Sequence, residues 1–191
     1  MQYPIIDLLK DVGGESVTGK NLISSPSATL ANNIYFALEN PIAGNYVFSV
    51  TGGLITGMYA SYSDEETMPD IISGANWTEV GRQYLTSAIA FTLTENHKWL
   101  KVMTYEQNGV IERDYQLELG NIATAYEPYF SITFPQLSAD DIAHRLKLPM
   151  LKYYPHAVIE ALQTVKNGET LTYEQYVVLK HYLTPLGIGG I

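Results

Sequence analysis

The sequence predicts a mainly β protein: an antiparallel β-sandwich or jelly roll over residues 20–130, followed by a C-terminal helical appendage of two to three short helices over residues 131–191. Three observations predict this fold class. Short segments of alternating apolar residues recur between turn signals in the first part. Helix-capping patterns begin only after Phe130. The charge changes at the same place, because residues 1–130 hold six Lys/Arg and fifteen Asp/Glu, whereas residues 131–191 hold five of each.

The composition excludes several classes of protein. With 46% hydrophobic and 16% charged residues, the chain is too apolar to be disordered. The absence of cysteine excludes disulfides, thiolate chemistry and cysteine-based zinc sites. The acidic first part argues against nucleic-acid binding, since no basic stripe is available to neutralise phosphates. No segment reaches the length of a transmembrane helix, and the N-terminus lacks the pattern of a signal peptide, so we expect a protein made in the cytoplasm, without membrane association.

Residues 1–19 are expected to form an N-terminal arm. Ile5, Leu8 and Leu9 recur at helical spacing before Gly13-Gly14 interrupts the pattern. Two interpretations stay open: a short helix that covers the protein's own core, and an arm that docks onto another subunit.

The strands of the β-domain are expected in short segments after this arm. The first four are residues 20–23, 34–38, 45–51 and 54–63. Gly52-Gly53 lies between the last two and predicts a hairpin, because the turns that favour hairpins need positive φ. Residues 63–74 are expected to connect the two sheets.

The second half of the β-domain contains one long alternating segment and one strong turn signal. Residues 83–94 are expected to form a single strand, with Ile89, Phe91 and Leu93 on one face. Asn108-Gly109 predicts a hairpin between strands at residues 98–105 and 110–119.

The β-domain is expected to close with the motif Q-L-E-L-G-N-I-A-T-A-Y-E-P, residues 116–128. Its structural residues are Glu118, the turn at Gly120-Asn121, Thr124 and Tyr126. We expect the Glu118 carboxylate to accept hydrogen bonds from nearby backbone N–H groups and so to hold the final strand in place.

The C-terminal part contains three helix signals. Ser138 with Asp141 predicts an N-cap for a helix that ends before Pro149, and Pro155 is expected at the first position of a second helix. Thr172 and Gln175 predict a capping box for a third. Helices this short must pack against something, so we expect an assembly interface on the third helix, at Tyr173, Tyr176, Leu179 and Leu183.

Candidate chemical sites are few. The sequence contains no nucleophile elbow, phosphate loop, dinucleotide fingerprint or zinc-protease motif, and we expect no enzyme activity, no metal and no cofactor. One alternative is a calcium site at Asp64, Glu65, Glu66 and Asp70. A second is a glycosidase pair of Glu118 with Glu112 or Asp114. A third is a histidine cluster of His144, His156 and His181. Solvated surface positions account better for each set, except that Glu118 is expected in the backbone-binding role above.

Aromatic side chains give the best candidate ligand site. Tyr59, Tyr62 and Trp99 are the candidate ligand-binding residues, because aromatic faces pack against the C–H faces of sugars. Trp77 can act in the same way, but we expect Trp77 and Trp99 to fill the sandwich core or to cover its end. Asn76-Trp77-Thr78 matches a glycosylation sequon, which is discounted without a secretory signal.

The closing motif L-E-L-G-N-I-A-T-A-Y-E-P resembles that of jelly-roll domains, similar to carbohydrate-binding modules, in virion structural proteins of tailed bacteriophages. The resemblance extends over about residues 20–130 and includes N-L-I at residues 21–23 and the segment that begins at Trp77. Tyr126 stands where many such modules carry tryptophan. The resemblance implies a noncatalytic head-fibre, capsid-decoration, tail or baseplate component located in the virion. Such proteins bind other virion proteins and are usually homo-oligomers, commonly trimers.

Two functions therefore remain open. In the first, the terminal regions assemble the protein on the virus particle and the jelly roll is displayed, in reach of a host-surface glycan. In the second, the chain is a free carbohydrate-binding, lectin-like adhesion module.

Overall fold

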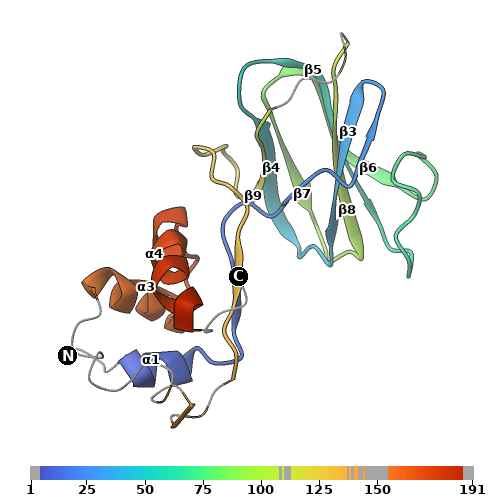
Figure 1. Cartoon of the computed structure of the whole chain (residues 1–191). Coiled ribbons are helices and arrows are strands. Elements are labelled where there is room, and N and C mark those ends of the chain that lie inside the picture. The colour runs from blue at the N-terminus through green and yellow to red at the C-terminus, as the bar shows by residue number, and fades with distance from the viewer. Residues whose placement is uncertain are drawn as a thin grey trace. The chain divides into compact units, whose positions relative to one another are not determined.

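A computed structural model describes residues 5–107, 109, 113–136, 138, 140–141, 144 and 155–186 of the chain. The chain forms two compact units (Figure 1). The β-domain is Asn21–Pro128, and the terminal unit combines Met1–Lys20 with Tyr129–Ile191.

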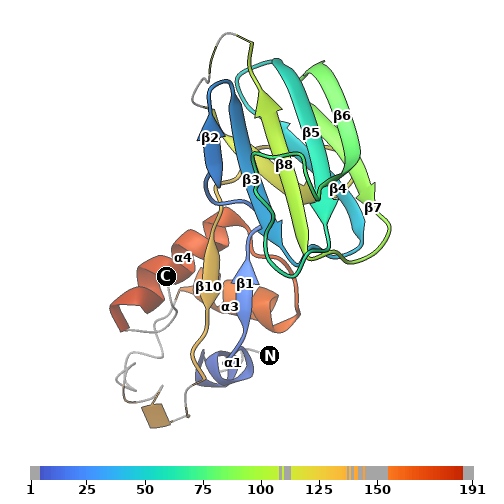
Figure 2. The same ribbon diagram turned by 90° about the vertical axis from the view of Figure 1, so that its right-hand side faces the viewer.

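The β-domain consists of two antiparallel sheets. The larger sheet has the order β2 (Ala28–Leu30), β3 (Asn33–Glu39), β8 (Trp99–Tyr105), β5 (Ile55–Ser63) and β6 (Thr78–Thr86), as Figure 2 shows. The smaller sheet has the order β7 (Ala88–Leu93), β4 (Gly44–Val50) and β9 (Tyr115–Leu119). The predicted β-sandwich with short C-terminal helices is confirmed.

Alternating residues of both sheets form the core of the β-domain. Phe36, Met58 and Leu100 from the larger sheet belong to one buried cluster with Phe48 and Leu117 from the smaller. In β7, Ile89, Phe91 and Leu93 are buried, as the period-two pattern predicts.

Both predicted hairpins are wrong. Strands β4 and β5, on either side of Gly52-Gly53, lie in different sheets, and so do β8 and β9, on either side of Asn108-Gly109. Gly52 and Gly53 do have positive φ, 81° and 116°. The positive φ of the glycines agrees with the prediction, but in a sandwich the same short glycine turn can lead the chain across to the other sheet.

Three further expectations need correction. Residues 83–94 divide into β6 and β7, in different sheets, and Leu85 near the break has a φ of 49°. Residues 63–74 connect β5 to β6, which are neighbours in the same sheet. Residues 20–23 form no regular strand, although the Leu22 N–H donates to the Leu117 carbonyl oxygen at 2.8 Å.

The terminal unit is built from both ends of the chain. Its described elements are α1 (Ile5–Asp11), β1 (Ser16–Thr18), β10 (Ser131–Thr133), α3 (His156–Lys166), α4 (Tyr173–Leu183) and the 3-10 helix η2 (Thr184–Leu186). Strand β1 pairs with β10, and Leu8 shares a buried cluster with Ile132, Leu162 and Leu179. Residues 1–19 therefore contribute a helix and a strand to the same core as the C-terminal helices.

The helix ends follow local signals. Thr172 and Gln175 form the predicted capping box. Pro155 is the N-cap of α3, one position before the predicted place. The Ser138 hydroxyl accepts the Asp141 N–H at 3.1 Å, and the remainder of the helix expected there lies outside the described residues. Over the part of the chain that the structure describes, we find no helix with the length and apolar character needed to cross a membrane.

Candidate functional site

Two adjoining depressions lie where β5 ends and β8 begins, and both include Asp64. The Trp77 depression has a volume of about 380 Å³ and is lined by Tyr62, Ser63, Asp64, Glu65, Asn76, Trp77 and Thr78. The His97 depression has a volume of about 320 Å³ and is lined by Asn40, Pro41, Ile42, Asp64, Asn96, His97 and Lys98. Each volume lies in the usual range for small-molecule sites.

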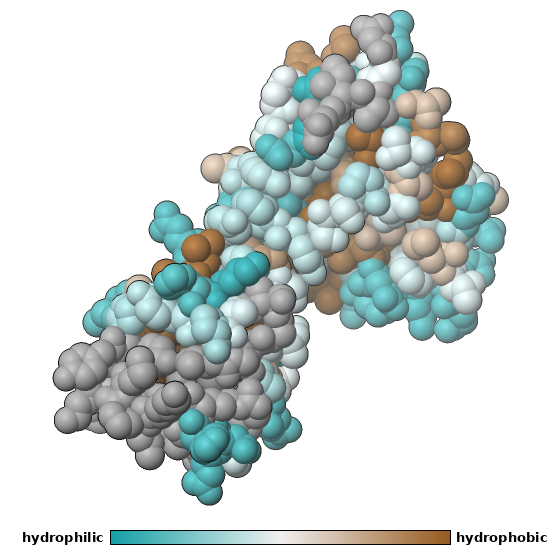
Figure 3. All heavy atoms as spheres, in the orientation of Figure 1, coloured by the Kyte–Doolittle hydropathy of each residue, from teal (hydrophilic) through white to brown (hydrophobic). Residues whose placement is uncertain are grey.

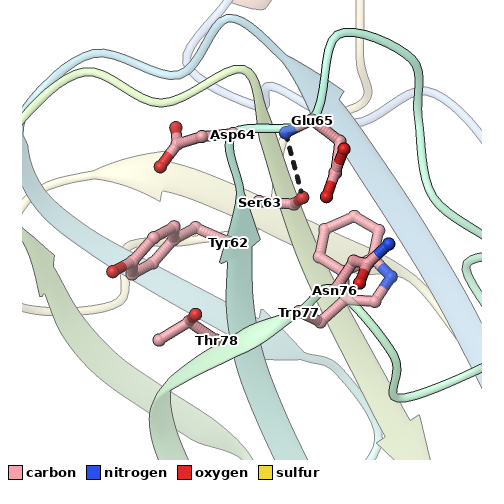
Figure 4. Close-up of a pocket in the computed structure, with 7 residues that line it drawn as sticks. All are labelled: Tyr62, Ser63, Asp64, Glu65, Asn76, Trp77 and Thr78. Atoms are coloured by element: carbon pink, nitrogen blue, oxygen red, sulfur yellow. Dashed lines mark hydrogen bonds between the residues drawn. The ribbon is translucent and has the colours of Figure 1, made fainter.

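The Trp77 depression is formed by the end of one strand and the start of the next. The Ser63 hydroxyl accepts the Glu65 N–H at 3.3 Å and turns the chain at the end of β5. Asn76 has a φ of 62°, a conformation that asparagine tolerates better than most residues, and it leads the chain into β6. In Figure 4, Tyr62 and Asp64 lie on one side of β5, and Trp77 and Glu65 on the other.

The His97 depression is held by hydrogen bonds between two loops. The Asn40 N–H donates to the Lys98 carbonyl oxygen at 2.8 Å, and the His97 N–H donates to the Pro41 carbonyl oxygen at 3.2 Å. The Asn96 side-chain oxygen accepts the Ala43 N–H at 2.7 Å. The backbone of this site is therefore fixed before any ligand binds.

His97 connects the two depressions. Its ring is buried and stacks on the Tyr62 ring, with 3.7 Å between the centroids. Its Nδ1–H donates to the Asp64 carboxylate, with nitrogen–oxygen distances of 3.0 and 3.2 Å. Because the Asp64 side chain remains 60% exposed, it can accept a further hydrogen bond from a ligand while the histidine holds it in place.

The three candidate ligand residues do not form one platform. Tyr62 lines the Trp77 depression, whereas Tyr59 contacts the Tyr84 ring and lies under the Arg82 guanidinium, 5.0 Å away. Trp99 is half-buried, and its Nε1–H donates to the Glu65 carbonyl oxygen at 3.1 Å. It supports the backbone beside the depression without lining it.

The two tryptophans were expected in the core or over its end. Neither belongs to the buried cluster of the sandwich, and Trp77 is half-buried. The Trp77 Nε1–H donates to the Asp70 carbonyl oxygen at 3.1 Å, so the indole is held on one edge while the residue lines the depression.

The acidic segment after β5 is dispersed. Asp64 binds His97, and the Glu66 carboxylate lies 3.6 Å from the Lys98 ammonium group. Within the described ranges, no group of three acidic or histidine side chains is arranged to hold a metal ion.

The closing motif is held by a buried polar network. The Glu118 carboxylate accepts the Thr124 N–H at 2.8 Å, the Thr124 hydroxyl at 2.7 Å and a Gln116 amide hydrogen at 2.8 Å. Gln116 in turn accepts the Glu127 N–H at 2.8 Å. Glu118 is 3% exposed, and these contacts occupy its oxygens, so it has no geometry for acid catalysis. Of its two possible partners, Asp114 is exposed and its carboxylate accepts the Thr51 hydroxyl at 3.5 Å, and Glu112 lies outside the described residues.

The other residues of the closing motif lie nearer the surface. Gly120 has a φ of 141° at the turn, and Asn121 follows it as an exposed residue. Tyr126 is 37% exposed and, with Thr124, lines a small depression of about 130 Å³ against β4.

The residues expected at an assembly interface divide into two groups. Leu179 and Leu183 are buried in the terminal unit's own core. Tyr173 is 37% exposed and, like Tyr176, contacts the Phe130 ring. An interface on α4 would therefore use the tyrosines and the exposed Val177.

The histidines considered from the sequence do not converge. His144 is exposed, His156 lies 3.0 Å from Glu160 on its own helix, and His181 contacts Tyr182. His97 could not be recognised from the sequence, because it belongs to no motif and has no helical spacing to another histidine. Its position between Asn96 and Lys98, just before a strand, gave no local signal of burial.

Comparison with solved structures gives remote neighbours, two of which are described here. No protein-family model matches the chain, and no curated protein matches it. The chain is similar to chitosan-binding module 1 from a chitosanase/glucanase of Paenibacillus sp. IK-5, with 9% identity, 59% of this chain and 98% of the other covered, and a TM-score of 0.35. It is also similar to the C-terminal domain of a chitobiase from Bacteroides fragilis, with 12% identity, coverage of 52% and 68%, and a TM-score of 0.32.

Proposed function

We propose that the β-domain is a noncatalytic carbohydrate-binding module, and that the sugar occupies the Trp77 and His97 depressions. The observation that carries the proposal is the lining of the Trp77 depression. The Trp77 indole lies there on one side of β5 with Glu65, and Tyr62 lies on the other side with Asp64, so aromatic, carboxylate, amide and hydroxyl groups all line the depression. A sugar presents apolar C–H faces and many hydroxyl groups, and it needs both kinds of partner.

The size of the site supports a ligand of more than one sugar ring. The depressions adjoin at Asp64, so a chain of sugars can extend from Trp77 past Asp64 to Lys98. The loops that form the walls are already bonded to each other, which lowers the entropic cost of binding.

The charge of the β-domain supports a neutral or cationic sugar. Residues 21–128 hold four Lys/Arg and twelve Asp/Glu, a formal charge of −8. Figure 3 shows polar side chains spread over the face in view, with apolar groups between them. Asp64 and Glu65 lie at the site itself, so a sulfated or uronic sugar would meet repulsion.

A glycan array that contains neutral, cationic and anionic oligosaccharides tests the proposed function. We expect the full chain to bind neutral or amino-sugar glycans, and to bind uronic or sulfated ones at least about tenfold more weakly. An array without bound glycans, or one on which only anionic glycans bind, would contradict the proposal.

We propose as a second role that the chain is a virion structural protein, attached through its terminal unit. The resemblance of the closing motif to phage jelly-roll modules supports this role, as do the exposed Tyr173, Val177 and Tyr182 on α4. Light scattering on the purified chain should give the mass of an oligomer that becomes monomeric in the double variant Tyr173→Ser, Val177→Ser. A wild-type chain that is monomeric and does not bind other virion proteins would refute self-assembly and attachment alike.

A further inference from the structure

Lys101 of β8 is a buried cation beneath the segment of residues 64–77. It is 6% exposed. Its ammonium group donates to the Ser73 carbonyl oxygen at 3.4 Å and lies 4.4 Å from the centroid of the Trp77 ring. This distance is typical of a cation–π interaction.

The surroundings of Lys101 contain little compensating charge. Its register neighbours on the adjacent strands, Ala37 and Ser61, are neutral. From the overlying segment, the charge of Asp70 acts on it. Burial lowers the pKa of Lys101 to about 8, and Asp70 partly opposes this effect.

This arrangement costs stability at neutral pH. The folded pKa lies below the ordinary value of 10.5, so the protonated amine lowers the free energy of unfolding below pH 8. The penalty is lost as the pH rises from 8 towards 10.5. An apolar side chain of similar size would pack here without lowering the free energy of unfolding. A buried charge that lowers stability is expected where the charge has a function.

The role follows from what the ammonium group contacts. Trp77 forms one wall of the Trp77 depression, and Lys101 lies against its ring. On the same strand, Trp99 holds the other end of the segment through the Glu65 carbonyl oxygen. Two residues of β8 thus fix the segment that supplies Glu65, Asn76 and Trp77 to the site.

We infer that Lys101 is a positioning residue of the binding site, whose ammonium group sets the orientation of the Trp77 indole and makes sugar binding dependent on pH. The pH dependence of sugar binding rests on the proposed function, whereas the orientation of the Trp77 indole by Lys101 does not. Loss of the proton removes the cation–π contact, leaves the indole held by its hydrogen bond to the Asp70 carbonyl oxygen alone, and weakens binding by about 3- to 10-fold.

Fluorescence of Trp77 tests the orientation of the indole by Lys101 without any sugar. Trp99 and its hydrogen bond to the Glu65 carbonyl oxygen are unchanged in both the wild type and Lys101→Met, so the difference between their emission reports on Trp77. Between pH 6.5 and 9.3, below the ionisation of ordinary tyrosines, we expect its emission and its quenching by acrylamide to change with a midpoint near pH 8. Lys101→Met should remove this transition, and Lys101→Arg, which keeps its charge, should hold the pH 7 emission throughout.

The outcomes distinguish the positioning role of Lys101 from the proposed binding of a sugar. An emission profile that is flat, or that is the same in Lys101→Met, would overturn the positioning role whether or not a sugar binds. A normal transition with no bound glycan would contradict the proposed function alone. Array binding at pH 6.5 that is undiminished at pH 9.0 would overturn the pH dependence.

Discussion

Replacing Asn21 by alanine is expected to lower the free energy of unfolding of the β-domain by about 2–4 kcal/mol. Asn21 is 1% exposed. Its amide donates to the carbonyl oxygens of Tyr115 and Glu127, both at 3.1 Å. Its side-chain oxygen accepts the N–H groups of Ile23 at 3.3 Å and Leu117 at 3.2 Å. Alanine leaves these four backbone groups without their partner in a buried place.

Urea unfolding of the two asparagine variants measures this effect. Asn32→Ala is the matched control, because Asn32 donates one long hydrogen bond, 3.4 Å, to the Gln107 carbonyl oxygen near the surface. We expect Asn32→Ala to lower the free energy of unfolding by less than about 1 kcal/mol. Equal losses in the two variants would show that the Asn21 network does not hold the first and last segments of the β-domain together.

Replacing Trp77 by alanine is expected to weaken sugar binding by about 10- to 100-fold, the effect of losing a central aromatic contact. The indole is the largest side chain that lines the Trp77 depression. Tyr84→Ala is the matched control. Tyr84 is 56% exposed and contacts Tyr59 and Arg82 on another part of the larger sheet. It should bind sugar within about threefold of wild type, because it removes an aromatic group outside the depressions.

The strands of the β-domain could largely be predicted from local patterns, but their pairing could not. The apolar run at residues 34–38 located β3, and alternation in residues 89–93 located β7, since alternation reflects burial on one face of a strand. Nothing local to Gly52-Gly53 says whether the next strand returns to the same sheet or crosses to the other. That choice depends on which apolar faces meet across the sandwich, as Phe48 and Met58 do.

That the terminal unit combines both ends of the chain could likewise not be predicted from local patterns. The sequence showed the helix of Leu8 and Leu9 and the capping box at Thr172 separately. Val17 pairs with Ile132, and no local pattern connects residues so far apart in the chain. The burial of Leu179 in a core shared with α1 follows from this long-range pairing.

The candidate site could be predicted only in part. Aromatic residues at 59, 62, 77 and 99 were evident, and the strand period alone separates Tyr59 from Tyr62, because they are an odd number of residues apart and point to opposite faces. The burial of His97 and Lys101 could not be predicted from the sequence, because it depends on which residues the loops and the segment of residues 64–77 cover.

The most direct test of the proposed site is calorimetric titration of wild type, Trp77→Ala and Tyr84→Ala with one oligosaccharide. The oligosaccharide is the one on the array to which the protein binds most strongly. Thermal unfolding must first show that all three proteins are folded. We expect Tyr84→Ala to keep the wild-type affinity and Trp77→Ala to lose affinity by at least about tenfold. If Trp77→Ala binds as wild type does while Tyr84→Ala loses binding, the sugar lies on the face of Tyr59 and Tyr84, and the proposed site is wrong.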